Sequence, residues 1–242
     1  MTRIAARNRG TFSSRLLLAA SSIIFLFAPV HAGEARAALY ELTSGADSPS
    51  FAAPSPAVYS AGPAAPLRAY FIDVGQGDAG YIELPNGRNV LIDGGPADPS
   101  GAGDPPIARF LSERNVSRID YMVLTHPHAD HYTGLLYVAD RMKVSEFYDT
   151  RVDNTGTSYD EALRERLRAS GAAMRYPAAG DVLDWGGSGV RVEVLNGCSS
   201  PLQTSAGQVL NDCSIVLKVS YDSSSILYTG DIQDDAEAVL VE

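Results

Sequence analysis

The sequence predicts a layered α/β fold, with two sheets packed together and helices outside them. A chain of 242 residues that is 45% hydrophobic is not intrinsically disordered, and its length fits one globular domain with appendages. From Leu67 onward, short apolar runs alternate with segments of helical periodicity. Turn residues such as Pro85-Asn86-Gly87 and Gly94-Gly95 separate these runs. The order of elements is therefore β-rich with inserted helices.

The first elements are a group of strands followed by a helix. Short strands are expected at residues 69–74, 79–84 and 89–93, with a hairpin between the second and third. Residues 104–115 predict a helix, because prolines come early and Ile107, Phe110 and Leu111 have helical spacing. The apolar strand at residues 121–125 follows directly.

The alternation continues in the second half of the chain. Residues 131–140 can open a helix, and residues 159–170 have helical propensity with Leu163 and Leu167 on one face. Strands are expected at residues 190–195, 214–220 and 225–228. Residues 234–242 look like a helix beginning rather than a domain finishing, so we expect a truncated or incomplete sequence.

The N-terminus reads as a secretory signal. Residues 1–15 carry four arginines and no acid, and an apolar run follows from Leu16 to Val30. This run is shorter than a membrane span usually needs, and small residues allow cleavage after Ala32 or after Ala37. An uncleaved anchor is the alternative. We expect a signal peptide at residues 1–32 and export to the periplasm, the cell surface or the medium.

Residues 33–66 are rich in Ala, Pro and Ser and predict a flexible linker, which leaves residues 67–242 for the folded domain. The chain carries 19 basic and 29 acidic residues, a net charge of −10, which argues against nucleic-acid binding by general electrostatics. Cys198 and Cys213 form no CxxC pair, so they do not indicate a structural zinc site. They are either joined by a disulfide, which export favours, or reduced and buried.

Three of the four histidines lie within six residues, at the junction of a predicted strand and helix. Imidazole and carboxylate are ligands of zinc and similar divalent ions, and extended backbone before Pro127 allows His126 and His128 to share one ion. Asp130 and His131 then face a second ion, as in two-metal hydrolases. A histidine-rich surface loop is the alternative reading.

These residues resemble the metallo-β-lactamase superfamily, whose HxHxDH hallmark is present as HPHADH at residues 126–131. The segments at 71–78, 90–95 and 228–231 look like successive motifs of its ComEC-type, competence-protein-like branch. The resemblance implies an αββα four-layer sandwich, here with an incomplete second half, and a dinuclear site at its upper edge. It also implies that Asp231 bridges the two ions and that Asp130 helps to orient a hydroxide. The ligand set itself does not choose among zinc, manganese and iron, because imidazole and carboxylate serve all three.

Other residues near these motifs have two readings each. Asp231 ends an apolar strand, where a carboxylate either enters a site or caps a helix. Asp93 ends a strand before two glycines, where it either orients a ligand histidine or holds a turn. A third group of residues resembles the family's entrance loop, but its sequence is equally typical of a tight turn. These residues are Asp73, Gln76 and Asp78.

The sequence departs from the family at the first metal ion. Many members supply a third histidine from a later loop, but no histidine follows His131. The corresponding region resembles the Asn-x-x-Ser of ComEC-type relatives and leaves three candidates near the site: Asn211, Asp212 and Cys213. A simple turn before the next strand is the alternative, and we favour it.

The sequence therefore predicts an exported hydrolase that uses one or two divalent ions, with zinc expected, to activate water. The resemblance implies phosphodiester cleavage, so nucleic acid is one substrate class to consider. Hydrolysis of esters, lactones or β-lactams stays open, as does a non-catalytic metal-binding or surface module. We expect no stable membrane insertion after signal cleavage, and no specific protein partner is implied.

Overall fold

The computed structural model describes residues 37–42, 65–98, 103–187, 189–198 and 200–240. The predicted signal peptide and most of the predicted linker lie outside these residues. Within the described ranges, no helix is both long and apolar enough to cross a membrane.

The larger sheet contains seven strands among the described residues, in the order β1-β2-β3-β4-β5-β6-β8. Their bounds are β1 (Ala37–Leu42), β2 (Leu67–Ile72), β3 (Gly80–Glu83), β4 (Asn89–Ile92), β5 (Arg118–Val123), β6 (Lys143–Tyr148) and β8 (Ala173–Arg175). The strands from β1 to β4 pair antiparallel, whereas β4, β5, β6 and β8 run parallel. The parallel strands need helical crossovers, and the intervening sequence supplies them.

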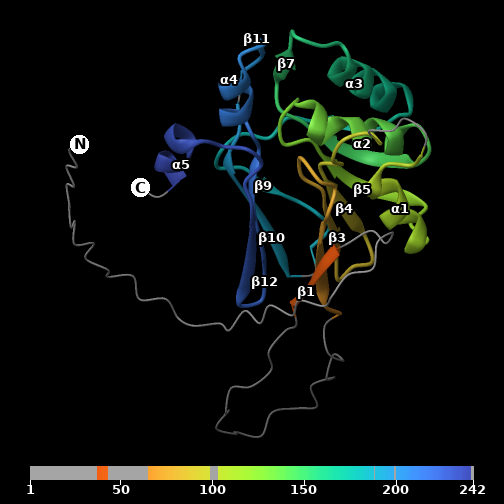
Figure 1. Ribbon diagram of the computed structural model, residues 1–242. Coiled ribbons are helices and arrows are strands. Elements are labelled where there is room, and N and C mark those ends of the chain that lie inside the picture. The colour runs from red at the N-terminus through yellow and green to blue at the C-terminus, as the bar shows by residue number, and fades with distance from the viewer. Residues whose placement is uncertain (1–36, 43–64, 99–102, 188, 199, 241–242) are drawn as a thin grey trace, which may run out of the picture. The chain divides into compact units, whose positions relative to one another are not determined.

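Three helices cover one face of this sheet (Figure 1). They are α1 (Pro106–Glu113), α2 (Ala129–Ala139) and α3 (Tyr159–Ala169). Each has an apolar stripe at helical spacing, such as Leu163 and Leu167 on α3, and these side chains are fully buried. They form one core with the inward side chains of the sheet, including Leu91, Met122 and Phe147.

A second sheet packs on the other face, in the order β13-β12-β10-β9. Its strands are β9 (Val182–Leu183), β10 (Val190–Asn196), β12 (Val216–Tyr221) and β13 (Ser224–Tyr228). Alternate residues of β10 and β12 are buried against the larger sheet, among them Val192, Val194, Leu217 and Val219. This period of two is what a sheet with one buried face requires.

Short elements lie at one end of the sandwich. Strands β7 (Val152–Asn154) and β11 (Leu202–Thr204) pair in parallel, and α4 (Gly207–Asp212) follows β11. A disulfide joins Cys198 to Cys213, which resolves the two predicted states of these cysteines. The last helix, α5 (Asp234–Leu240), contacts β10.

The predicted arrangement of two sheets with helices outside them is confirmed. The linker prediction is wrong at Ala37–Leu42, because this segment hydrogen-bonds to the open edge of β2 as strand β1. The Ala/Pro/Ser-rich composition around it masks this pairing. Helix α2 also begins at Ala129, two residues before the predicted start, directly after the extended His128.

Candidate metal centre

The site lies at the end of two neighbouring parallel strands. Ile92 of β4 is paired with Val123 of β5, so the residues after both strands reach the same edge of the sheet. The backbone N–H of Asp93 donates to the carbonyl of Val123 at 2.9 Å. The backbone N–H of Thr125 then donates to Asp93 Oδ1 at 2.8 Å, and its hydroxyl donates to Asp93 Oδ2 at 2.6 Å. These bonds fix Asp93 beside the start of the histidine motif.

The turn from β5 into α2 brings two histidines together. His126 follows β5, His128 keeps an extended backbone, and His131 lies in the first turn of α2. As a result, the rings of His126 and His131 have centroids 4.1 Å apart, and both side chains are fully buried.

Asp231 reaches these rings from the second sheet. It follows β13 after Gly230, whose φ is +53° and whose position has no room for a side chain. A Cβ there would lie 2.9 Å from Ser214 Cβ and 3.0 Å from Thr125 Cβ. Glycine therefore meets both the backbone and the packing requirement of this turn. The turn at Gly230 thereby positions Asp231 next to His126 and His131.

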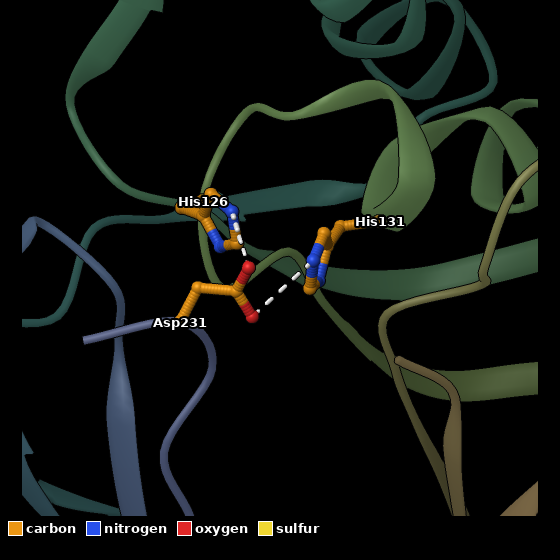
Figure 2. Close-up of side chains that lie close together, drawn as sticks. All are labelled: His126, His131 and Asp231. Carbon is orange, nitrogen blue, oxygen red and sulfur yellow. Dashed lines mark ion pairs between the residues drawn. The ribbon is translucent and has the colours of Figure 1, made fainter. Parts of the chain in front are cut away.

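The three side chains point at one another (Figure 2). Asp231 Oδ2 lies 3.9 Å from His126 Nε2, and Asp231 Oδ1 lies 3.5 Å from His131 Nε2. Both Nε2 atoms are buried without a hydrogen-bond partner. The three ligand-type atoms lie within 4.8 Å of one another. Buried imidazole nitrogens that face a carboxylate and lack partners are the arrangement that a divalent ion would complete.

The other ring nitrogens are already held. His131 Nδ1 lies 2.9 Å from Asp93 Oδ2, while His126 Nδ1 lies 3.1 Å from Thr125 Oγ1 and 3.2 Å from Ser214 Oγ. Partners at Nδ1 select the tautomer whose Nε2 lone pair is free for a metal. The donor set therefore fits a divalent ion, and Asp93 has the orienting position that was one of its two predicted readings.

The electrostatics of the two histidines differ. Burial, with a further contribution from the positive charge of His131, lowers the pKa of His126 to about 4, so this ring is neutral at pH 7. Burial also acts to lower the pKa of His131, but the carboxylates of Asp93 and Asp231 outweigh it and raise that pKa to about 11. Two carboxylates around one buried imidazole favour positive charge at this place, whether a proton or a metal ion supplies it.

Two predicted ligands lie beside this cluster. The His128 ring is half-buried and meets the His126 ring edge-on, with centroids 4.8 Å apart. Asp130 Oδ2 accepts a hydrogen bond of 3.0 Å from Gln76 Nε2, which ties the predicted entrance loop to the motif. The structure thus brings His126, His131 and Asp231 into one group and places His128 and Asp130 at its rim.

The remaining predicted residues occupy different places. Asp78 lines a cavity of about 230 Å³ together with Asp93, and burial raises the pKa of Asp78. Asp73 is exposed, and its Oδ1 accepts the backbone N–H of Gly75 at 3.2 Å, so its recorded contact is that of a turn. Asn211 lies in α4, and its side-chain oxygen is buried without a hydrogen-bond partner.

Sequence reasoning assigned no role to two residues of the site. Thr125 and Ser214 both contact His126, and the Ser214 hydroxyl also accepts the backbone N–H of Asp231 at 3.2 Å. Both are small hydroxyl residues at strand ends. The sequence offered one signal for each: Thr125 directly precedes the histidine motif, and Ser214 directly precedes an apolar strand.

Comparisons with known proteins agree with this geometry. The sequence model of the family described as "Metallo-beta-lactamase superfamily" matches residues 72–233, well over half of the chain. ComE operon protein 3 of Bacillus subtilis (strain 168) is 26% identical over 179 residues, which cover 69% of this chain and 22% of the relative. The chain therefore spans about a fifth of the length of that curated relative.

Two solved structures with limited similarity to this chain have different descriptions. The metallo-beta-lactamase fold protein YhfI from Bacillus subtilis has 12% identity and a TM-score of 0.41, with 66% of this chain and 57% of that chain covered. CmlA, a diiron beta-hydroxylase from Streptomyces venezuelae, has 16% identity and a TM-score of 0.41, with 62% and 27% covered. The match over residues 72–233, which contain the whole histidine and aspartate cluster, shows that the chain belongs to the metallo-β-lactamase superfamily, with similarity to its ComEC-type branch.

Proposed function

We propose that this protein is an exported, metal-dependent hydrolase that cleaves phosphodiester bonds with an activated water. One observation carries the proposal: two buried Nε2 atoms without hydrogen-bond partners lie on either side of the Asp231 carboxylate. A structural histidine pair would have its nitrogens satisfied internally, whereas a metal site leaves them available. Membership of a superfamily rich in metal-dependent hydrolases supports the same conclusion.

The residues of the chain have distinct tasks in this proposal. His126 and His131 supply nitrogen ligands and Asp231 supplies oxygen, while His128 and Asp130 complete the set from the rim. Asp93 orients His131 through the 2.9 Å contact at Nδ1. Asp130, which accepts a hydrogen bond from Gln76, would help to orient the attacking water. A bound divalent ion would lower the pKa of that water and stabilise the charge that develops on the substrate.

The substrate class rests on the ComEC-type resemblance, which supports phosphodiesters and hence nucleic acid. The net charge of −10 acts against this class, because it repels a polyanion over distances of a Debye length. We therefore expect binding of nucleic acid to depend on the metal centre rather than on general attraction. Export rests on the arginine-led apolar segment within residues 1–32.

The test is metal analysis together with hydrolysis of bis(p-nitrophenyl) phosphate by the purified protein. We expect one or two divalent ions per chain and turnover that a chelator abolishes and added metal restores. His126→Ala should lose both metal and turnover, and Glu113→Gln on the exposed side of α1 should change neither. A folded protein without metal would contradict the site. Bound metal without turnover on phosphodiesters, esters, lactones or β-lactams would favour a non-catalytic metal-binding module.

A further inference from the structure

A cavity rich in arginine lies at the opposite end of the larger sheet from the metal centre. It has a volume of about 470 Å³ and is lined by the start of β2, the turn between β3 and β4, the end of α1 and the start of β5. Strands β4 and β5 run parallel, and the residues of the metal centre follow their other ends. The cavity is therefore separate from the candidate metal centre.

The cavity is positive, although the protein as a whole is acidic. Among the described residues, its charged lining consists of four arginines and one glutamate, a charge of +3: Arg68, Arg88, Arg114, Arg118 and Glu83. The net charge of the whole chain is −10. Positive charge gathered in a hollow of an acidic protein attracts small anions to that place.

Two of the four arginines have carboxylate partners. Arg68 Nη1 lies 3.7 Å from Glu83 Oε2, which also accepts a hydrogen bond of 3.4 Å from the Tyr70 hydroxyl. Arg118 Nε donates to Asp120 Oδ1 at 3.1 Å. The protein itself therefore balances part of the charge of these two side chains.

The other two arginines are held by neutral groups. The guanidinium carbon of Arg114 lies 4.2 Å from the centre of the Tyr70 ring and 4.6 Å from that of Phe110. Arg88 Nη1 donates to the hydroxyl of Tyr121, whose side chain is buried. Within the described part of the chain, neither guanidinium has a carboxylate in ion-pair contact. Both are therefore positioned by the protein, but neither has a counter-charge.

The ligand that fits this lining is a small diphosphate. A guanidinium presents paired N–H donors in one plane, which match two oxygens of a phosphate, and Arg88 and Arg114 supply two such groups. The volume lies within the range of about 300–1,000 Å³ that is typical of small-molecule sites. A nucleic-acid strand would extend beyond the cavity over a protein of net charge −10, which repels a polyanion.

We infer that this cavity is a binding site for a small diphosphate, which Arg88 and Arg114 bind directly and to which Arg68 and Arg118 add attraction. The site uses none of the residues of the metal centre, so it goes beyond the proposed hydrolysis. It gives the protein a second ligand, at the other end of the strands that carry the histidine motif.

Trp185, the single tryptophan of the chain, provides an optical readout. Its ring stacks on Tyr121, with centroids 5.9 Å apart, and its carbonyl accepts a hydrogen bond of 2.9 Å from Asn86 Nδ2. Because Arg88 donates to the Tyr121 hydroxyl, a ligand that binds Arg88 changes the surroundings of the indole. Fluorescence therefore detects binding, and calorimetry measures the dissociation constant.

The test is titration of the full chain with inorganic pyrophosphate and, in a second arm, with ADP. Arg88→Gln and Arg114→Gln each remove one guanidinium, whereas Arg114→Lys keeps the charge and the apolar stem. Arg175→Gln is the matched control, because Arg175 is an exposed arginine at the end of β8, outside the cavity, and its ion pair with Glu146 measures 2.9 Å. His126→Ala separates the cavity from the metal centre.

We expect wild type to bind pyrophosphate with a change in Trp185 fluorescence, and to bind it more weakly as salt is added. Arg88→Gln and Arg114→Gln should each raise the dissociation constant about ten-fold or more, the effect of losing a charged hydrogen-bond donor. Arg114→Lys should lose less affinity. Arg175→Gln and His126→Ala should match wild type. Tighter binding of ADP than of pyrophosphate would identify an organic diphosphate as the occupant, and equal binding an inorganic one.

Three results would overturn the inference. The first is a folded wild type that binds no pyrophosphate. The second is equal weakening by Arg175→Gln, because net charge alone would then explain the effect. The third is loss of binding in His126→Ala with full affinity in Arg88→Gln, which would assign the ligand to the metal centre. Melting temperatures show whether each variant is folded, and Arg88→Gln with Arg114→Lys carries the test if Arg114→Gln is not.

Discussion

Asp93 Oδ2 lies 2.9 Å from His131 Nδ1, and both side chains are buried. The same carboxylate accepts the N–H and the hydroxyl of Thr125, so three contacts fix its orientation. It joins strand β4, the end of β5 and the first turn of α2 at one point. The pair therefore links the packing of the sheet to the chemistry of the site.

Asp93→Asn should weaken metal binding about 10- to 100-fold, the usual cost of losing a residue that orients a ligand histidine. An amide presents an N–H as well as an oxygen and no longer selects one tautomer of His131. Competition with a chromogenic chelator measures the effect. Asp120→Asn is the control, because Asp120 is also a buried carboxylate that accepts a backbone N–H, from Asn89 at 3.0 Å. Equal metal affinity in Asp93→Asn and wild type would show that the contact is only structural.

Gly134→Ala should destabilise the protein by about 2–3 kcal/mol, although alanine is the better helix former by about 1 kcal/mol. A Cβ at Gly134 would lie 1.9 Å from the backbone oxygen of Gly94, where α2 crosses the turn after β4. The N–H of Gly134 also donates to the carbonyl of Gly95 at 2.9 Å. Urea denaturation gives the free energy of unfolding. Gly197→Ala, with its nearest neighbour at 3.4 Å, should be close to neutral. A more stable Gly134→Ala variant would refute the close approach.

The site could be predicted from sequence where adjacent residues carry it. The histidine motif, Asp93 and Asp231 follow strands, and strand ends are recognisable because apolar runs stop there. It was harder to predict which of these side chains lie close enough to share one ion, because sequence spacing alone does not give the distances between side chains in the folded protein. The sequence paired His126 with His128, whereas the structure places His126, His131 and Asp231 within 4.8 Å.

Elements without clear periodicity were not predicted. Lys143–Tyr148 forms β6, whose burial is irregular: Lys143 and Ser145 are exposed, whereas Val144 and the consecutive Phe147 and Tyr148 are buried. The short pair of β7 and β11 depends on partners about 50 residues apart in the chain, as in the Leu202–Val152 pairing. Strand β1 depends on the edge of β2 in the same way. Such pairings are tertiary, so local sequence does not report them.

Arg164→Met should lower the free energy of unfolding by about 3–5 kcal/mol, because it leaves buried carboxylates without a counter-charge. Arg164 contacts Asp149 at 2.6 Å and Asp160 at 2.9 Å, and it donates to the carbonyl of Val152 at 2.7 Å. Arg166→Met on the same helix is the control: its exposed ion pair with Asp140 should be worth less than about 1 kcal/mol. Equal losses of unfolding free energy in the two variants would show that burial does not determine how much each ion pair contributes to stability.

The loss of unfolding free energy caused by Arg164→Met should also depend on pH. Burial raises the pKa of Asp149 from 3.8 to about 6, against the opposing pull of Arg164. A carboxyl whose folded pKa is raised favours folding when protonated, so its contribution is lost as pH rises from about 4 through about 6. Without Arg164 that pKa rises further. Wild type and variant therefore lose this contribution equally up to about pH 6, and we expect the gap between them to widen above about pH 6, where only the variant still loses stability. A constant gap in urea melts at pH 4.5 and 7.5 would contradict this account.

Replacing both Cys198 and Cys213 by serine should cost about 3 kcal/mol, the value expected for a loop with a sequence separation of 15 residues. The bridge closes the loop that carries β11 and α4, and Cys213 directly precedes Ser214, which contacts His126. The variant should therefore also bind metal more weakly, because the unfolded ensemble and the loop both gain freedom. Urea denaturation with and without dithiothreitol measures the loss. Dithiothreitol should destabilise wild type and leave the variant unchanged; insensitivity of wild type with accessible, reduced thiols would show that the bridge adds no stability.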